Sequence, residues 1–395
     1  MSTVTNLGRW WVVAAGACLL ALVGCGTSAH PNPDAKPSDG KSSDGTPSDV
    51  PADGTDAPTI NSNDASKDAS SDADAGQDRP APTVVATLGA VPVSLALNAD
   101  LLYVTLAETA AGQDGKVVSV SKAGVDATPD AGVTTFVSGL NSPRAIAVSD
   151  GRVLWADAEM AFPHNPDVNA LPLAGGTPTE VVAAFTMTRL PIAGSVLYAL
   201  TGNTTTISAV PLASVDAGAP TLVYPGNPPN GIVNPDSDGA FVYFFTNGTT
   251  NLDLLKVAVG GGAATTLAMN ATSGSVNFDY LVDDASTIYW SDSGSGSIFS
   301  LPKAGGTTKS KLATISSGSA AVQLVLDGEN IYALSPGQLA RFPKAGGTPV
   351  VLASVSDSGS ERYVGSLGNV VALAVDDAFV YWLYTGHGQI LKLAK

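Results

Sequence analysis

The chain has 395 residues, of which 14% are charged and 44% are apolar, and it contains 42 Gly and 26 Pro. Glycine costs about 1 kcal/mol per helical position relative to alanine, so this composition disfavours a coiled coil or a helical bundle. The formal net charge of −16 argues against nucleic acid as a partner, because its phosphates would repel so acidic a surface.

Residues 1–24 are expected to be an export signal. Arg9 precedes an apolar run that ends at Leu22 and is shorter than the roughly 20 residues of a membrane-spanning helix. The sequence LVGC, which ends at Cys25, resembles the lipobox of bacterial lipoproteins. This resemblance implies cleavage before Cys25, acylation of its sulfur and a place in the bacterial cell envelope. Gly26 in the next position favours the outer membrane, and an ordinary signal peptide with a chance Cys is the alternative.

Cys18 and Cys25 are the only cysteines, so the rest of the chain must fold without a disulfide or a thiolate metal site. Residues 25–81 are predicted to be the lipidated cysteine followed by a disordered tether. From Gly26 to Ala81 there is no aromatic residue, and 11 Asp stand against four basic residues. Such a segment cannot bury enough apolar surface to offset its chain entropy.

From residue 82 to the end of the chain, short apolar runs bounded by Gly, Asp, Asn or Pro recur, which is typical of β-strands. Alignment of the second run of each unit gives a column of residues 43 to 51 positions apart: Tyr103, Leu154, Tyr198, Tyr243, Tyr289, Tyr332 and Tyr381. Units of four strands at this period predict an all-β fold, a seven-bladed β-propeller over 82–395, with six or eight blades as alternatives. The last unit lacks a fourth strand, so we expect Pro82 to Leu88 to pair with it and close the ring.

Several units resemble known propeller repeats. IYWSD at 288–292, LWAD at 154–157 and YWLY at 381–384 are similar to the YWTD repeats of LDL-receptor-type propellers, and GLNSPRAIAVSDG at 139–151 resembles an NHL repeat. YWTD propellers have six blades, whereas seven units are counted here. The resemblance implies a propeller and no particular activity. Tyr289, Trp290 and Trp382 in these repeats are expected to pack between blades rather than to stack on carbohydrate.

No motif for a nucleophile elbow, a zinc protease, a P-loop or a dinucleotide-binding turn is present in the sequence, which has only three His. The sequence therefore favours a binding protein over an enzyme, and it leaves an enzymatic function open. The alternative is a metal-assisted lactonase or lyase whose acidic residues, such as Glu108 and Glu159, converge at the mouth of the propeller.

No cofactor or metal is expected, with one calcium candidate. Asn234, Asp236 and Asp238 in NPDSDG imitate the start of a calcium loop. Phe245 stands where a bidentate Glu belongs, so ordinary turn residues are the simpler interpretation.

Loops that follow second strands, and those between blades, are expected to share one face, which would point away from the membrane. We predict a lipid-anchored binding or scaffold module, monomeric, whose partner beyond the membrane is an envelope protein or a glycan. The candidate ligand-face residues are Arg144, Asp157, His164, Arg189, Asp292, Glu361, Arg362 and His387.

Overall fold

The computed structural model describes residues 81–395 except for 108–113, 125–128, 158–166, 184–188, 202–204, 213–218, 227–230, 248–250, 273–279, 293, 307, 316–322, 336–337 and 355–371. The predicted signal peptide, Cys25 and the predicted tether up to residue 80 lie outside the described residues. All described residues belong to one compact unit, Ala73–Lys395.

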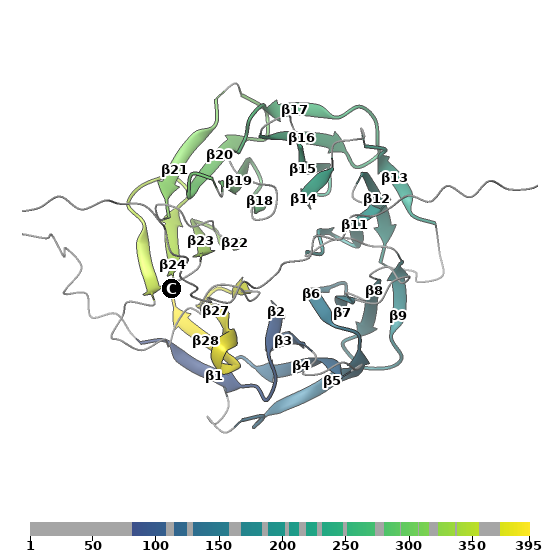
Figure 1. Ribbon diagram of the computed structural model, residues 1–395, viewed down its shortest axis with the longest axis vertical. Helices are drawn as coiled ribbons and strands as arrows, with labels where there is room; N and C mark the ends of the chain where they lie inside the picture. Colours follow the sequence, from purple (N-terminus) through teal and green to yellow (C-terminus); the bar gives the residue numbers. More distant parts are fainter. Residues whose placement is uncertain are drawn as a thin grey trace, which may run out of the picture. The chain divides into compact units, whose positions relative to one another are not determined.

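Seven antiparallel sheets of four strands each surround a common axis, and the first strand of each sheet lies nearest that axis (Figure 1). Sheets 1 to 4, numbered along the chain, consist of β2 (Pro92–Leu97), β3 (Leu101–Leu106), β4 (Gly115–Ser121) and β5 (Val133–Leu140); β6 (Pro143–Ser149), β7 (Arg152–Asp157), β8 (Val168–Pro172) and β9 (Thr179–Val182); β10 (Ile192–Ala193), β11 (Val196–Thr201), β12 (Thr206–Pro211) and β13 (Thr221–Tyr224); β14 (Ile232–Ser237), β15 (Phe241–Asn247), β16 (Leu252–Ala258) and β17 (Thr265–Ala268).

Sheets 5 to 7 consist of β18 (Leu281–Asp283), β19 (Thr287–Asp292), β20 (Ser297–Pro302) and β21 (Ser310–Thr314); β22 (Gln323–Leu326), β23 (Asn330–Ser335), β24 (Gln338–Pro343) and β25 (Val350–Ser354); β26 (Leu373–Val375), β27 (Phe379–Tyr384), β28 (Gln389–Ala394) and β1 (Thr83–Thr87). A short 3-10 turn, η2 (Thr385–His387), joins β27 to β28. No helix among the described residues is long and apolar enough to cross a membrane. The predicted seven-bladed β-propeller is confirmed.

Burial explains why the sequences of the second strands are continuous apolar runs. In β19 five consecutive residues from Ile288 are buried, whereas the outer strand β21 has no buried residue. The second strand is covered on both faces by neighbouring sheets, so its sequence does not alternate. All members of the aligned Tyr/Leu column lie on second strands, and Trp290 and Trp382 are fully buried, as predicted.

The ring closes through the first strand of the described chain. β1 pairs with β28, with Thr83 opposite Lys392 and Thr87 opposite Gln389, which confirms the predicted closure. The Leu88 amide donates to the Gly388 carbonyl at 2.6 Å. Gly388 has φ of +62°, and a Cβ there would lie 2.6 Å from the Leu88 oxygen, so only glycine permits this close approach.

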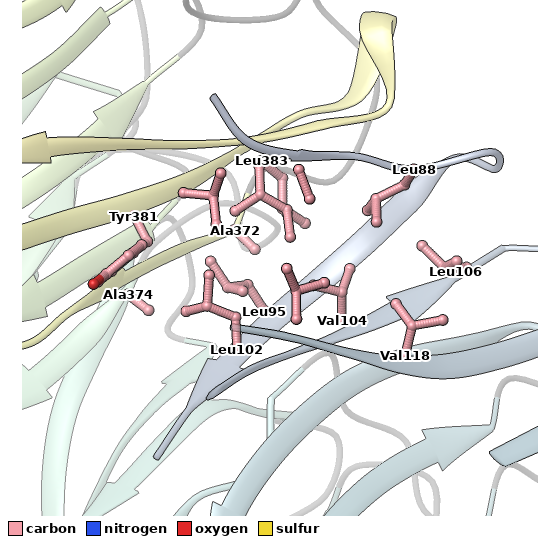
Figure 2. Close-up of a cluster of buried hydrophobic side chains, with 14 residues drawn as sticks. Leu88, Leu95, Leu102, Val104, Leu106, Val118, Ala372, Ala374, Tyr381 and Leu383 are labelled. Atoms are coloured by element: carbon pink, nitrogen blue, oxygen red, sulfur yellow. The ribbon is translucent and has the colours of Figure 1, made fainter. Parts of the chain in front are cut away.

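An apolar cluster fixes the closing strand against both of its neighbours. Figure 2 shows Leu88 beyond the end of β1, Leu95 and Val104 from sheet 1, and Tyr381 and Leu383 from β27 pointing toward one another. Leu88 is 4% exposed and Val104 is fully buried. Sheet 7 therefore packs on sheet 1 through β26 and β27 together with β1.

Four of the seven sheet boundaries share a contact that we call the clasp. An Asp directly after or near the end of a first strand accepts from a Tyr hydroxyl on the second strand at 2.9–3.0 Å. The same carboxylate pairs at 2.8–3.0 Å with a Lys that follows the third strand of the next sheet. The clasps are Asp238–Tyr243–Lys303, Asp284–Tyr289–Lys344, Asp327–Tyr332–Lys395 and Asp376–Tyr381–Lys122.

The clasp between sheets 5 and 6 shows how each carboxylate is used. Asp284 Oδ1 accepts from the Ser286 and Thr287 amides, and Oδ2 accepts from Tyr289 and Lys344. Burial by itself would raise the pKa of Asp284, but these hydrogen bonds outweigh it and lower the pKa to about 2. Burial and the bond to Asp284 raise the pKa of Tyr289 to about 12.

The other three boundaries have an aliphatic residue in place of the lysine. Leu173, Leu212 and Val259 each donate a backbone hydrogen bond to the first turn of their own sheet, as Lys303 and Lys344 do in theirs. They therefore occupy the lysine position without its charge. Sheets 2 and 3 instead join through an apolar cluster and through the bond from Arg152 Nη1 to the Leu212 carbonyl.

Replacement of Tyr289 by Phe should lower the free energy of unfolding by about 1–2 kcal/mol, because a hydrogen bond to a charged, partly buried carboxylate is lost. Tyr198→Phe is the matched control, since Tyr198 bonds the neutral Ser237 and should cost less. The difference between the two variants in lost free energy of unfolding should narrow as the pH falls from about 4 to about 2, because Asp284 is then protonated in the native state. Equal losses in urea unfolding at pH 7 would contradict this assignment.

Candidate functional site

Arg189 forms the centre of a polar cluster on the inner strands. It lies three residues before β10, the innermost strand of sheet 3, and its Nη1 donates to the Leu281 carbonyl at the start of β18 at 2.7 Å. The guanidinium carbon lies 4.0 Å from the centre of the Tyr280 ring, an arrangement typical of cation–π contact. One side chain from sheet 3 thus reaches sheet 5, past the strand of sheet 4 between them.

Asp236 on β14 is the acidic member of the cluster. Its Oδ2 lies 3.9 Å from Arg189 Nη2, which is an ion pair but too long for a hydrogen bond. Burial raises the pKa of Asp236 to about 6, opposed by the Arg189 charge, while Asp283 raises it further and Lys303 lowers it. The two side chains are 17% and 19% exposed.

Tyr280 and Gln323 extend the cluster along the inner strands. Tyr280 lies directly before β18; burial raises the pKa of its phenol, and the neighbouring Gln323 side chain opposes that rise. Gln323 begins β22, accepts from the Leu373 amide at 2.6 Å and donates to the Leu373 carbonyl at 3.1 Å. Side chains from four sheets, 3 to 6, therefore form one connected polar group around the axis.

The cluster is suited to hold a polar ligand. Within the described part of the chain, the Arg189 guanidinium makes a single hydrogen bond, although it carries five N–H groups. Asp236 Oδ1 accepts from the Ser237 amide at 3.1 Å, and Oδ2 is hydrogen-bonded to no described group. Donors and an acceptor thus remain available side by side. No described residue of the cluster is a Ser, Cys or His placed to act as a nucleophile with a base.

Two of the residues singled out in the sequence meet here. Arg189 was predicted on the ligand face and Asp236 as a calcium ligand, and the structure brings them together. The other two calcium candidates, Asp238 and Asn234, have different roles in the structure. Asp238 accepts from the Ala240 and Phe241 amides and takes part in a clasp, whereas Asn234 has a φ of +47° within the irregular pairing of β14 with β15.

Asp157 and Asp292 stand at the ends of second strands and organise their own hairpins. Asp157 Oδ2 accepts from Asn169 at 3.2 Å, a residue of the next strand. Asp292 is 1% exposed and accepts from the Gly294 amide and the Ser295 hydroxyl.

Two more of the candidate ligand-face residues are described, one in sheet 2 and one in sheet 7. Arg144 on β6 has an exposed side chain, and its carbonyl accepts from Thr105. His387 in η2 stacks on Tyr384 with 4.6 Å between ring centres. His164, Glu361 and Arg362 lie outside the described residues, as do Glu108 and Glu159. The eight-residue ligand face thus stays a prediction.

Tyr280 and Gln323 were missed in the sequence, although a signal was present. Leu281 pairs with Trp290 and Leu324 with Ala333, so Tyr280 and Gln323 occupy the same position of consecutive repeats. A polar or aromatic residue directly before an apolar inner strand, repeated at the blade period, marks the inner edge of the ring. Among the described residues, no group of three or more His, Cys, Asp or Glu is arranged to hold a metal ion.

No protein-family model matches the chain, and no curated protein matches it. Similar solved structures include the extracellular domain of a hybrid two component system from B. thetaiotaomicron, with a TM-score of 0.56, 13% identity, and coverage of 78% of this chain and 39% of that chain. The β-propeller domain of the Trilobed protease from Pyrococcus furiosus has a TM-score of 0.52 and 10% identity, covering 77% and 95%. The WD40 β-propeller domain of Doa1 has a TM-score of 0.51 and 13% identity, covering 80% and 97%.

These likenesses show the fold alone: residues 82–395 form a β-propeller. The Trilobed protease domain has an open velcro topology, whereas here β1 closes the last sheet. The YWTD and NHL similarities remain resemblances of individual repeats.

Replacement of Asp236 by Asn should change how stability depends on pH. Because the pKa of Asp236 rises from 3.8 to about 6 on folding, the native state binds the proton more tightly, and the wild type loses stability as the pH rises through this window. Relative to Asp236→Asn, the wild type should lose up to about 3 kcal/mol between pH 4 and pH 7. Urea unfolding at several pH values measures this, and a pH-independent difference would contradict the raised pKa.

Proposed function

We propose that the protein is a lipid-anchored binding or scaffold module of a bacterial cell envelope, and that it performs no catalysis. The propeller provides a rigid frame on which inner strands and loops present polar groups. The lipobox-like sequence at Cys25 supports the anchor, and Gly26 supports an outer-membrane location. Partners would be an envelope protein or a glycan, bound by a monomeric propeller.

The observation that carries this proposal is the direction of β1. Thr83 pairs with Lys392, which pairs in turn with Tyr381 beside the clasp to Asp376. The strand therefore starts at the edge of the ring that carries the clasps. Connections from second to third strands, and from one sheet to the next, leave the opposite edge, since the strands alternate in direction. An anchored chain entering at the clasp edge would present these connections away from the membrane.

Replacement of Cys25 by Ser should abolish acylation and move the protein from the membrane fraction to the soluble fraction. Cys18→Ser, the matched control, should leave both unchanged, because Cys18 lies outside the lipobox-like sequence. Metabolic labelling with radioactive palmitate and fractionation measure the outcome. A Cys25→Ser variant that is still acylated would refute the anchor.

The alternative is a metal-assisted lactonase or lyase, and the specific feature that favours it is Asp236, a partly buried carboxylate with a pKa near neutrality. Metal analysis of the purified full chain separates the two functions. We expect no stoichiometric divalent ion and no change in the melting temperature with EDTA. One tightly held ion per chain would overturn the non-catalytic assignment, and its persistence in Asp236→Asn would place the ion elsewhere.

A further inference from the structure

The gap between Arg189 and Asp236 has a specific chemistry. The 3.9 Å between Nη2 and Oδ2 is too long for a direct hydrogen bond and short enough for one oxygen atom to bridge the two groups. Such a bridging group must accept from a guanidinium and donate to a carboxylate. A hydroxyl does both, as does water, whereas a carboxylate or phosphate only accepts and an ammonium only donates.

Charge around the gap selects a neutral ligand for the same reason. An anion at Arg189 would face Asp236, with Asp283 close enough to raise the pKa of Asp236. A cation at Asp236 would face Arg189, with Lys303 also near. Lys303 is itself paired with Asp238 and Asp283. An anionic ligand therefore meets repulsion from Asp236, and a cationic ligand meets repulsion from Arg189.

Further polar groups lie beside the gap. Tyr280 lies under the Arg189 guanidinium, with the Gln323 side chain beside its phenol. The amide of Gln323 makes one bond through its oxygen and one through its nitrogen, both to the Leu373 backbone, so each atom has capacity for a second. A ligand with several hydroxyls on adjacent carbons can use these groups together with the bridge.

From this geometry we infer that the Arg189–Asp236 gap on the inner strands binds a neutral sugar through a vicinal diol. One hydroxyl accepts from Arg189 and donates to Asp236, and its neighbour accepts from a further N–H of Arg189. This deepens the proposed binding function and rests on it, and it assigns a ligand class to a site that includes residues from sheets 3 to 6.

Saturation-transfer NMR on the full chain tests this assignment with methyl α-mannoside and methyl β-galactoside as neutral probes, and with glucuronate and glucosamine as charged ones. We expect at least one neutral glycoside to bind more tightly than either charged sugar. Arg189→Gln and Asp236→Asn should each weaken that binding about tenfold or more, since each removes a charged hydrogen-bond partner. Absence of binding by both neutral glycosides would overturn the assignment.

Arg152→Gln is the matched control. Arg152 Nη1 donates to the Leu212 carbonyl at 2.6 Å, so this variant also loses an arginine–carbonyl bond between sheets, yet it lies outside the cluster. Its sugar binding should be unchanged. Equal weakening in all three variants would mean that the ring had been loosened generally and would overturn the role of the gap.

Two further readouts keep the test decisive if Arg189→Gln does not fold. Arg189→Lys retains the charge but loses the planar fork, and it should still lower affinity. Asp236→Asn removes the negative charge and should raise the affinity for glucuronate relative to the neutral glycoside. A purely structural role would leave that ratio constant and would overturn the inference.

The outcome is distinguishable from failure of the proposed function. If the glycosides do not bind while the Cys25→Ser and metal experiments give the expected results, the sugar assignment fails and the anchored, non-catalytic module stands. If a glycoside binds and its NMR signals convert to those of a product, the non-catalytic function fails.

Discussion

The structure depends on how each four-stranded sheet is held against the next. A single sheet of this size leaves both faces of its second strand exposed, and only a neighbour on each side covers them. At four consecutive boundaries a clasp adds an oriented charged contact to this apolar packing. The first joins Asp238 to Lys303, and the last joins Asp376 to Lys122. Each clasp joins a turn, a strand and the next sheet in one hydrogen-bonded unit, so the spacing between these sheets is fixed by polar geometry as well as by volume.

The clasps are unevenly distributed around the ring, and the polar cluster connects a sheet that has none to sheets that have them. Sheet 3 has no clasp on either side, because Leu212 and Val259 occupy the lysine positions. Arg189, from this sheet, bonds Leu281 in sheet 5 and faces Asp236 in sheet 4. The cluster thus ties a sheet without clasps to the clasped part of the ring. A ligand that engages Arg189 would bear on that connection.

The fold followed from the sequence to a large extent, and the site did not. Repeats at a near-constant period showed the blades, and the unpaired strand at 82–88 showed the closure. Of the predicted ligand-face residues in the described region, Arg189 joins the cluster, whereas Asp292 bonds within its own hairpin. The sequence indicates Asp236 only as a ligand in a calcium loop. Spacing along the chain relates it to Asp238 and not to an arginine 47 positions earlier.

The sequence alone determined the propeller fold, the closing strand, the packing role of the buried aromatic residues and the absence of common catalytic motifs, and it favoured seven blades over six or eight. Each of these is local or periodic, and burial on both sides of a strand leaves a direct trace in residue type. Only the tertiary structure decided which polar residues meet. The clasps join residues as far apart as Lys122 and Asp376, and Arg189 meets Leu281 across an intervening sheet. The physical reason is ring closure, which brings the ends of the first strands together around an axis that no segment of the sequence defines by itself.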